Sequence, residues 1–187
     1  MLRSTVTNYQ MFDREMKADK ARGRCITKRP LDLFERYNKK CIKIIRDPRS
    51  VMTSVHWSRP GYFVSSDKCA TGHPGIITMW EAYKRKDGFE VRYEELTRDP
   101  DRIQDELLLT FDFEYQGKFS DFHNTEPPDT NMRKAINGLR PVDRGHDWRE
   151  HKERIRDQFT RFPQMFDILI EMGYEEDNNW YERVLAG

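Results

Sequence analysis

The stretch Cys41-Ile42-Lys43-Ile44-Ile45-Arg46-Asp47-Pro48-Arg49-Ser50-Val51-Met52-Thr53-Ser54 is the part of this sequence that decides its fold. Its three isoleucines predict a buried strand over residues 41–45. The proline is well suited to the first turn of a helix, which we expect over residues 48–57. A strand that turns directly into a helix is typical of α/β folds, and the backbone amides at the start of such a helix attract anions.

Two side chains strengthen the anion-binding character of this corner. Arg46 follows the predicted strand, and its guanidinium can bind a phosphate through two parallel hydrogen bonds. Ser54 comes eight residues later and can donate a further hydrogen bond. The alternative is an ordinary strand-to-helix corner with an exposed arginine and a solvent-facing serine, because short motifs also occur by chance.

Length and composition favour a single folded domain over residues 1–187. A chain of 187 residues can bury a core, and an aromatic content of 12% argues against disorder. Strands and helices alternate along the sequence, which predicts an α/β domain with a parallel sheet between two layers of helices. Further helices are expected over residues 8–21, 30–37, 75–86, 148–159, 163–172 and 180–185 and from Asp99 onward, further strands over residues 24–27 and 89–93, and a long loop over residues 59–74.

Charge and cysteine content argue against several classes of protein. A net charge of +1 gives no support for general nucleic-acid binding. The three cysteines form no Cys/His cluster of the kind that binds zinc, and they favour a reducing compartment. No apolar stretch is long enough to span a membrane, and the first residues of the sequence show no apolar region of the kind found in signal peptides. We therefore expect a cytoplasmic protein with no metal, no nucleic-acid partner and no membrane anchor.

The order Arg46-Asp47-Pro48-Arg49, with Ser54 after it, resembles the 3′-phosphate-binding segment of sulfotransferases that use 3′-phosphoadenosine 5′-phosphosulfate (PAPS). The resemblance implies that Arg46 and Ser54 hold the 3′-phosphate. The later stretch Val91-Arg92-Tyr93-Glu94-Glu95-Leu96 is similar to the next motif of that family. This similarity implies that Tyr93 contacts the adenine, although a core role for an aromatic residue at a strand end is an equal alternative.

Two weaker matches extend the resemblance. The stretch Thr27-Lys28-Arg29-Pro30 is similar to a Lys-x-Pro segment of bacterial and tyrosyl-protein sulfotransferases. It implies that Lys28 stabilises charge on the transferred group. The loop over residues 139–148 resembles a C-terminal signature of the family, which implies that Arg140 or Arg144 contacts the 3′-phosphate. The alternatives are an exposed lysine in a basic turn and solvated loop arginines.

One part of the family's pattern is missing. Sulfotransferases carry an upstream 5′-phosphosulfate loop that contains glycine, because backbone amides must curl around the phosphate. The closest stretch here, Leu2-Arg3-Ser4-Thr5-Val6-Thr7-Asn8, has no glycine and follows no strand. We expect a truncated chain, a shortened variant or an inactive relative.

The resemblance implies a P-loop NTPase-like sulfotransferase fold, and transfer of a sulfuryl group from PAPS to an acceptor hydroxyl or amine. The acceptor would be a small molecule, a carbohydrate or a peptide, bound by the loop over residues 59–74 and the region 114–135. Two other classes stay open. One is a non-catalytic nucleotide-binding protein of the same fold. The other is a small P-loop-like kinase, which is disfavoured because the sequence has no G-x-x-x-x-G-K-[ST] motif.

Overall fold

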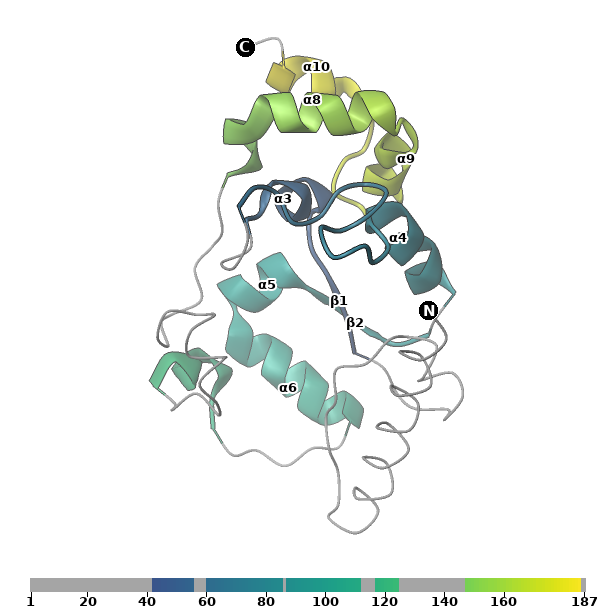
Figure 1. The fold of residues 1–187 in the computed structure, drawn as a ribbon. Helices are drawn as coiled ribbons and strands as arrows, with labels where there is room; N and C mark the ends of the chain where they lie inside the picture. Colours follow the sequence, from purple (N-terminus) through teal and green to yellow (C-terminus); the bar gives the residue numbers. More distant parts are fainter. Residues whose placement is uncertain (1–41, 56–59, 86, 112–116, 125–146, 186–187) are drawn as a thin grey trace. The chain divides into compact units, whose positions relative to one another are not determined.

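The computed structural model describes residues 42–55, 60–85, 87–111, 117–124 and 147–185 (Figure 1). These residues belong to one compact unit, Ile42–Gly187, and Met1–Cys41 lies outside it. The elements expected over residues 8–21, 24–27 and 30–37 therefore fall outside the described residues. A single domain over residues 1–187 stays a prediction.

The described residues form a mixed α/β structure that is mostly helical. Strands β1 (Ile42–Ile45) and β2 (Phe89–Arg92) pair in parallel, with Ile45 opposite Arg92. The helices are α3 (Pro48–Thr53), α4 (Ile76–Lys84), α5 (Tyr93–Arg98), α6 (Pro100–Phe111), α8 (Lys152–Arg161), α9 (Gln164–Glu171) and α10 (Asn179–Leu185), and the 3-10 helices are η1 (Phe119–Asn124) and η2 (Trp148–His151).

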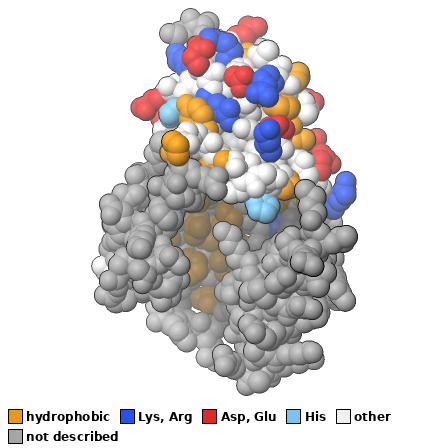
Figure 2. All heavy atoms as spheres, viewed as in Figure 1, with side chains coloured by type: hydrophobic (Ala, Val, Ile, Leu, Met, Phe, Trp, Pro, Cys, Tyr) orange, Lys and Arg blue, Asp and Glu red, His pale blue; other side chains and the backbone are white. Residues whose placement is uncertain are grey.

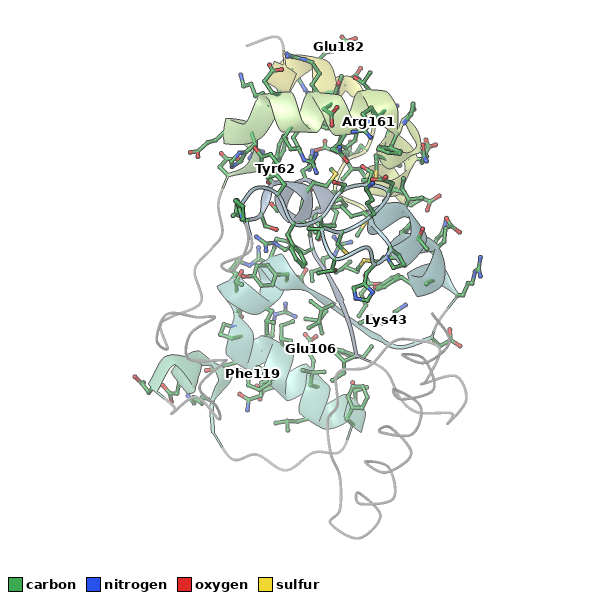
Figure 3. The ribbon with its side chains drawn as sticks, in the orientation of Figure 1. Lys43, Tyr62, Glu106, Phe119, Arg161 and Glu182 are labelled. Carbon is green, nitrogen blue, oxygen red and sulfur yellow. The ribbon has the colours of Figure 1, made fainter. Side chains whose placement is uncertain are left out.

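Helices lie on both faces of the strand pair. Side chains alternate between the two faces of a sheet, so Lys43 and Phe89 lie on opposite faces. The Lys43 ammonium lies 3.9 Å from the ring centroid of Tyr83 on α4 (Figure 3). The Phe89 ring meets Phe111 of α6 edge-on, with the centroids 6.2 Å apart. Helices α4 and α6 therefore cover different faces.

The main core lies among α3, α4 and the C-terminal helices. Phe159 of α8 is at its centre, and its ring meets that of Trp180 at 5.1 Å. The amphipathic patterns that predict helices over residues 148–159 and 163–172 are confirmed, since η2, α8 and α9 occupy these segments. Fully buried apolar side chains come from α3 and, about a hundred residues later, from the consecutive helices α8 and α9: Met52, Ile155, Met165 and Leu169.

Two predicted elements end earlier than expected. The helix expected over residues 48–57 ends at Thr53, and Ser54 has an extended backbone with φ −71° and ψ 143°. The Ser54 amide and hydroxyl both donate to the carbonyl oxygen of Val51, which closes the helix end. The strand expected over residues 89–93 ends at Arg92, and Tyr93 already belongs to α5.

The described surface carries charges of both signs. Figure 2 shows Lys and Arg side chains interspersed with Asp and Glu over the upper, coloured part of the face that it presents. Positive and negative charge are therefore mixed over this described part rather than gathered in separate patches. Within the described ranges, no helix combines the length and the apolar composition needed to cross a membrane.

Candidate functional site

The corner between β1 and α3 is built around Asp47. Its carboxylate accepts a hydrogen bond from the Arg49 amide at 2.8 Å, and its carbonyl accepts one from the Val51 amide at 3.1 Å. This is the geometry of a helix N-cap, and Pro48 occupies the first helical position. The Asp-Pro pair therefore starts the helix for local reasons.

Two backbone amides at this corner are less available to an anionic ligand than the sequence suggested. The Arg49 amide donates to the Asp47 side chain, and the Asp47 amide donates to Oε1 of Glu94 at 2.9 Å. Both amides already bind carboxylates of the chain itself. An anion would have to displace these carboxylates to reach the two amides, so anion binding by the first backbone amides of the helix stays a prediction.

Arg46 and Tyr93 lie together at the carboxyl ends of the two strands. Arg46 follows β1 and Tyr93 follows β2, and the parallel register places these positions side by side. The Arg46 guanidinium lies 4.5 Å from the centroid of the Tyr93 ring. In the part of the chain that the structure describes, Arg46 forms no ion pair and no hydrogen bond. Its charge is therefore open to an anionic ligand.

No described contact connects the other predicted site residues with Arg46 and Tyr93. Ser54 lies at the opposite end of α3 from Arg46, and its hydroxyl donates to the Val51 carbonyl at 2.8 Å. That hydroxyl must rotate before it can donate to a ligand. Lys28, Arg140 and Arg144 lie outside the described residues, and their roles stay predictions.

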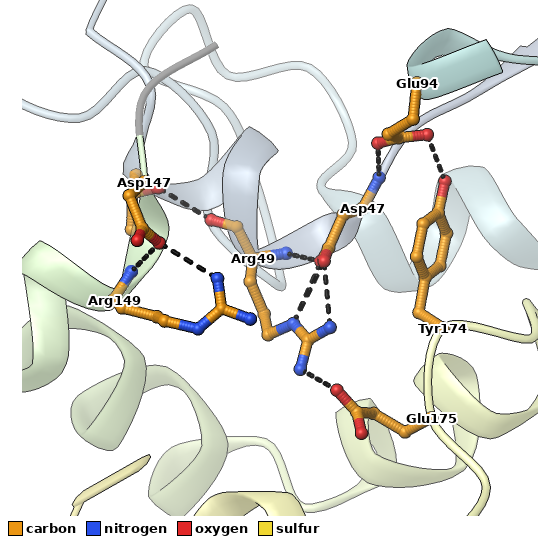
Figure 4. Close-up of polar contacts among 8 residues, drawn as sticks. Asp47, Arg49, Glu94, Asp147, Arg149, Tyr174 and Glu175 are labelled. Carbon is orange, nitrogen blue, oxygen red and sulfur yellow. Dashed lines mark hydrogen bonds and ion pairs between the residues drawn. The ribbon is translucent and has the colours of Figure 1, made fainter. Parts of the chain in front are cut away.

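Arg49 is the residue at this corner that the sequence analysis missed. Its side chain is only 4% exposed. Its guanidinium donates to both carboxylate oxygens of Asp47, from Nε at 3.0 Å and from Nη2 at 2.8 Å, and Nη1 forms an ion pair with Glu175 (Figure 4). Two negative charges therefore surround one buried positive charge.

Two indole rings complete the surroundings of Arg49. The guanidinium carbon lies 4.2 Å from the ring centroid of Trp148 and 4.6 Å from that of Trp180. Guanidinium groups stack on aromatic faces because the ring quadrupole attracts the charge. The Asp-Pro-Arg spacing could have indicated the Asp47 contact, but no local pattern identifies the distant partners.

The end of α9 directs two side chains at the same corner. Gly173 has φ +70°, its amide donates to Ile170 O, and the Tyr174 amide donates to Leu169 O, each at 2.9 Å. This arrangement is a Schellman motif, which turns the chain away from the helix axis. Tyr174 and Glu175 then face the β1–α3 corner, where they contact Glu94 and Arg49.

The loop before α4 is held by α8. The Tyr62 hydroxyl and His151 Nδ1 are 3.1 Å apart, and the Arg154 guanidinium lies 4.9 Å from the Tyr62 ring centroid (Figure 3). Arg154 also donates to Val64 O at 3.1 Å and to Ser65 Oγ at 2.7 Å. Burial lowers the pKa of the Arg154 guanidinium from its usual value. These contacts give the loop a fixed conformation. Its role in acceptor binding stays a prediction.

Among the described residues, no group of three or more His, Cys, Asp or Glu side chains is arranged to hold a metal ion. Comparison of the chain with protein-family models finds no match. No curated protein and no solved structure matches it either. The resemblance to sulfotransferases therefore rests on the quoted sequence motifs alone.

Proposed function

We propose that this chain binds an adenine nucleotide with a 3′-phosphate and that it transfers the sulfuryl group of PAPS to an acceptor. The observation that carries the proposal is the pairing of Arg46 with Tyr93 at the carboxyl ends of two parallel strands. Ligands of open α/β sheets bind at this edge. A P-loop NTPase-like sulfotransferase fold over the whole chain is part of the same proposal.

The proposal assigns Arg46 to the 3′-phosphate. A guanidinium without a carboxylate partner can give both of its forked donors to a phosphate. The Tyr93 ring has one face against Arg46, so an adenine would contact its other face or its edge. Ser54 would add one hydrogen bond after its hydroxyl leaves the Val51 carbonyl. Arg140 or Arg144 would supply a further positive charge to the same phosphate.

Catalysis would depend on position and charge rather than on a covalent intermediate. The acceptor oxygen or nitrogen attacks the sulfur in line, the bond from the sulfur to the phosphate oxygen breaks, 3′-phosphoadenosine 5′-phosphate leaves, and the acceptor's proton passes to water. Lys28 would stabilise the negative charge that develops on that phosphate oxygen. The acceptor would be a small molecule, a carbohydrate or a peptide, and no metal is needed for this chemistry.

Isothermal titration calorimetry tests the nucleotide assignment. The chain should bind 3′-phosphoadenosine 5′-phosphate more tightly than 5′-AMP, because only the former carries the 3′-phosphate. Arg46→Ala should remove most of that preference, at a cost of about 1.5–3 kcal/mol for one charge-assisted contact. Arg85→Ala is the control, since this exposed arginine precedes β2 and so lies at the opposite end of the strand. Equal affinity of the unmodified chain for both nucleotides would rule out the assignment.

A second candidate is a nucleotide-binding protein without catalytic activity. It is favoured by the occupied amides of Asp47 and Arg49, which leave Arg46 as the main anion-binding group described at this corner. A sulfuryl-transfer assay separates the two candidates. An active chain should lose about two to three orders of magnitude in transfer rate with Lys28→Met, while its nucleotide affinity changes little. Binding without transfer to any acceptor class would favour the second candidate.

A further inference from the structure

The Glu94 carboxylate connects the two strand ends to the C-terminal segment. Its Oε1 accepts the Asp47 amide at 2.9 Å, and its Oε2 accepts the Tyr174 hydroxyl at 2.9 Å (Figure 4). Each carboxylate oxygen thus has one donor, and the two donors come from segments that are far apart in the sequence. Together they fix the direction in which the carboxylate points.

This carboxylate is held next to the residues that flank and contact Arg46. Glu94 follows Tyr93, whose ring lies against the Arg46 guanidinium, and its Oε1 binds the amide of the residue that follows Arg46. Yet Arg46 and Glu94 form no ion pair. Opposite charges attract, and even a partly solvated ion pair gains a modest free energy from this attraction. A released Glu94 side chain would therefore tend to turn toward Arg46 and neutralise it.

We propose that Tyr174 is a positioning residue that holds the Glu94 carboxylate away from Arg46, so that the Arg46 guanidinium stays open to an anion. This inference deepens the proposed function and rests on it. Among the described contacts, the Tyr174 hydroxyl donates to Glu94 and its ring lies near Arg92, and none joins it to Arg46. It acts only through Glu94.

The surroundings of Tyr174 suit this role. Its backbone is fixed by the Schellman motif at the end of α9, and the Arg92 guanidinium lies 5.1 Å from its ring centroid while donating to Met172 O at 2.7 Å. Burial, followed by the hydrogen bond to Glu94, raises the pKa of the Tyr174 phenol well above its usual value. The hydroxyl therefore remains protonated, and a donor, at physiological pH.

A double-mutant cycle tests the inference, with 3′-phosphoadenosine 5′-phosphate as the probe in calorimetry. Tyr174→Phe keeps the ring and removes the donor, and it should weaken binding by about two- to fivefold, the range expected when an ion pair near the surface competes for Arg46. Glu94→Gln removes the competing charge and should strengthen binding. In the Glu94→Gln background, Tyr174→Phe should have no effect.

The matched control is Tyr83→Phe, which removes another phenol that donates to a glutamate, Glu90, at the opposite end of β2. It should leave the affinity unchanged. An equal loss from Tyr174→Phe in both backgrounds would mean that the phenol only supports the fold, and no loss in either would mean that Glu94 needs no restraint. Either result overturns the inference while the preference for the 3′-phosphate stands. If the unmodified chain shows no such preference, both proposals fail together.

Discussion

Arg46 and Arg49 stand on the same corner of the molecule, but their surroundings are opposite. Arg46 is half-buried against one aromatic ring and has no counter-ion among the described residues. Arg49 is almost fully buried, paired with Asp47 and Glu175 and enclosed by two indoles. A buried charge is tolerated only when it is paired and hydrogen-bonded, whereas a charge at the surface can stay unpaired. The comparison indicates that one arginine serves the fold and the other is free to serve a ligand.

The largest expected difference between the two arginines is in stability. Arg49→Ala leaves Asp47 and Glu175 without their cation and removes the guanidinium that contacts both Trp148 and Trp180. It should lower the free energy of unfolding by about 3–5 kcal/mol, the usual result of removing one partner of a buried ion pair. Urea denaturation monitored by tryptophan fluorescence measures the loss.

Arg46→Ala is the matched control for that experiment. Among the described contacts it breaks that with Tyr93 alone, and it should cost about 1 kcal/mol or less. Its effect should appear instead in nucleotide affinity. Similar losses of stability in Arg49→Ala and Arg46→Ala would contradict the distinction between a structural and a ligand-binding arginine.

A smaller effect is expected from Glu175→Gln. The change removes one of the two negative charges around Arg49 but keeps an oxygen that can accept its hydrogen bond. Asp47 still neutralises the guanidinium, so the loss should be about 1–3 kcal/mol, below that of Arg49→Ala. Urea denaturation again provides the measurement. Glu176→Gln, at the exposed neighbouring position, should change stability by less than about 0.5 kcal/mol. Equal effects at the two positions would show that the Arg49–Glu175 pair contributes nothing specific.

The smallest expected effect is a change in the pKa of Asp101. Like Asp47, Asp101 accepts a backbone amide hydrogen bond through its carboxylate, but it is more exposed. Its carboxylate accepts the Ser120 amide at 2.8 Å and the Ser120 hydroxyl at 2.9 Å. The amide hydrogen bond is the main cause that lowers the pKa of Asp101 below 3.8, and the hydroxyl adds to it. Because the pKa is lower in the folded state, the stabilisation is present above about pH 4 and is lost as the pH falls through the folded-state value.

A titration of the Asp101 carboxyl group followed by NMR measures this effect. Ser120→Ala keeps the amide and removes the hydroxyl, so the pKa of Asp101 should rise only part of the way toward its usual value. A complete return to that value would show that the amide contributes little. An unchanged pKa would show that the hydroxyl contributes nothing.

Local patterns predicted much of the fold at the candidate site. The isoleucine run and the Asp-Pro pair identify β1 and the start of α3, because strand preference and capping act between near neighbours in sequence. The end of α3 was predicted too late. Hydroxyls of Thr53 and Ser54 bond backward to the carbonyls of Arg49 and Val51, and such side chains compete with the helix in a way that periodicity does not reveal.

The sequence by itself determined that a strand ends just before Arg46 and that a helix begins after Asp47. Each of these features depends on the conformational preferences of a few adjacent residues. Only the tertiary structure decided which arginine is buried. Arg49 and Glu175 are 126 positions apart, and their pairing depends on how the C-terminal helices pack against α3. Burial therefore gives the two arginines different roles. The cost of removing a charge from water is set by the surrounding atoms and not by the neighbouring sequence.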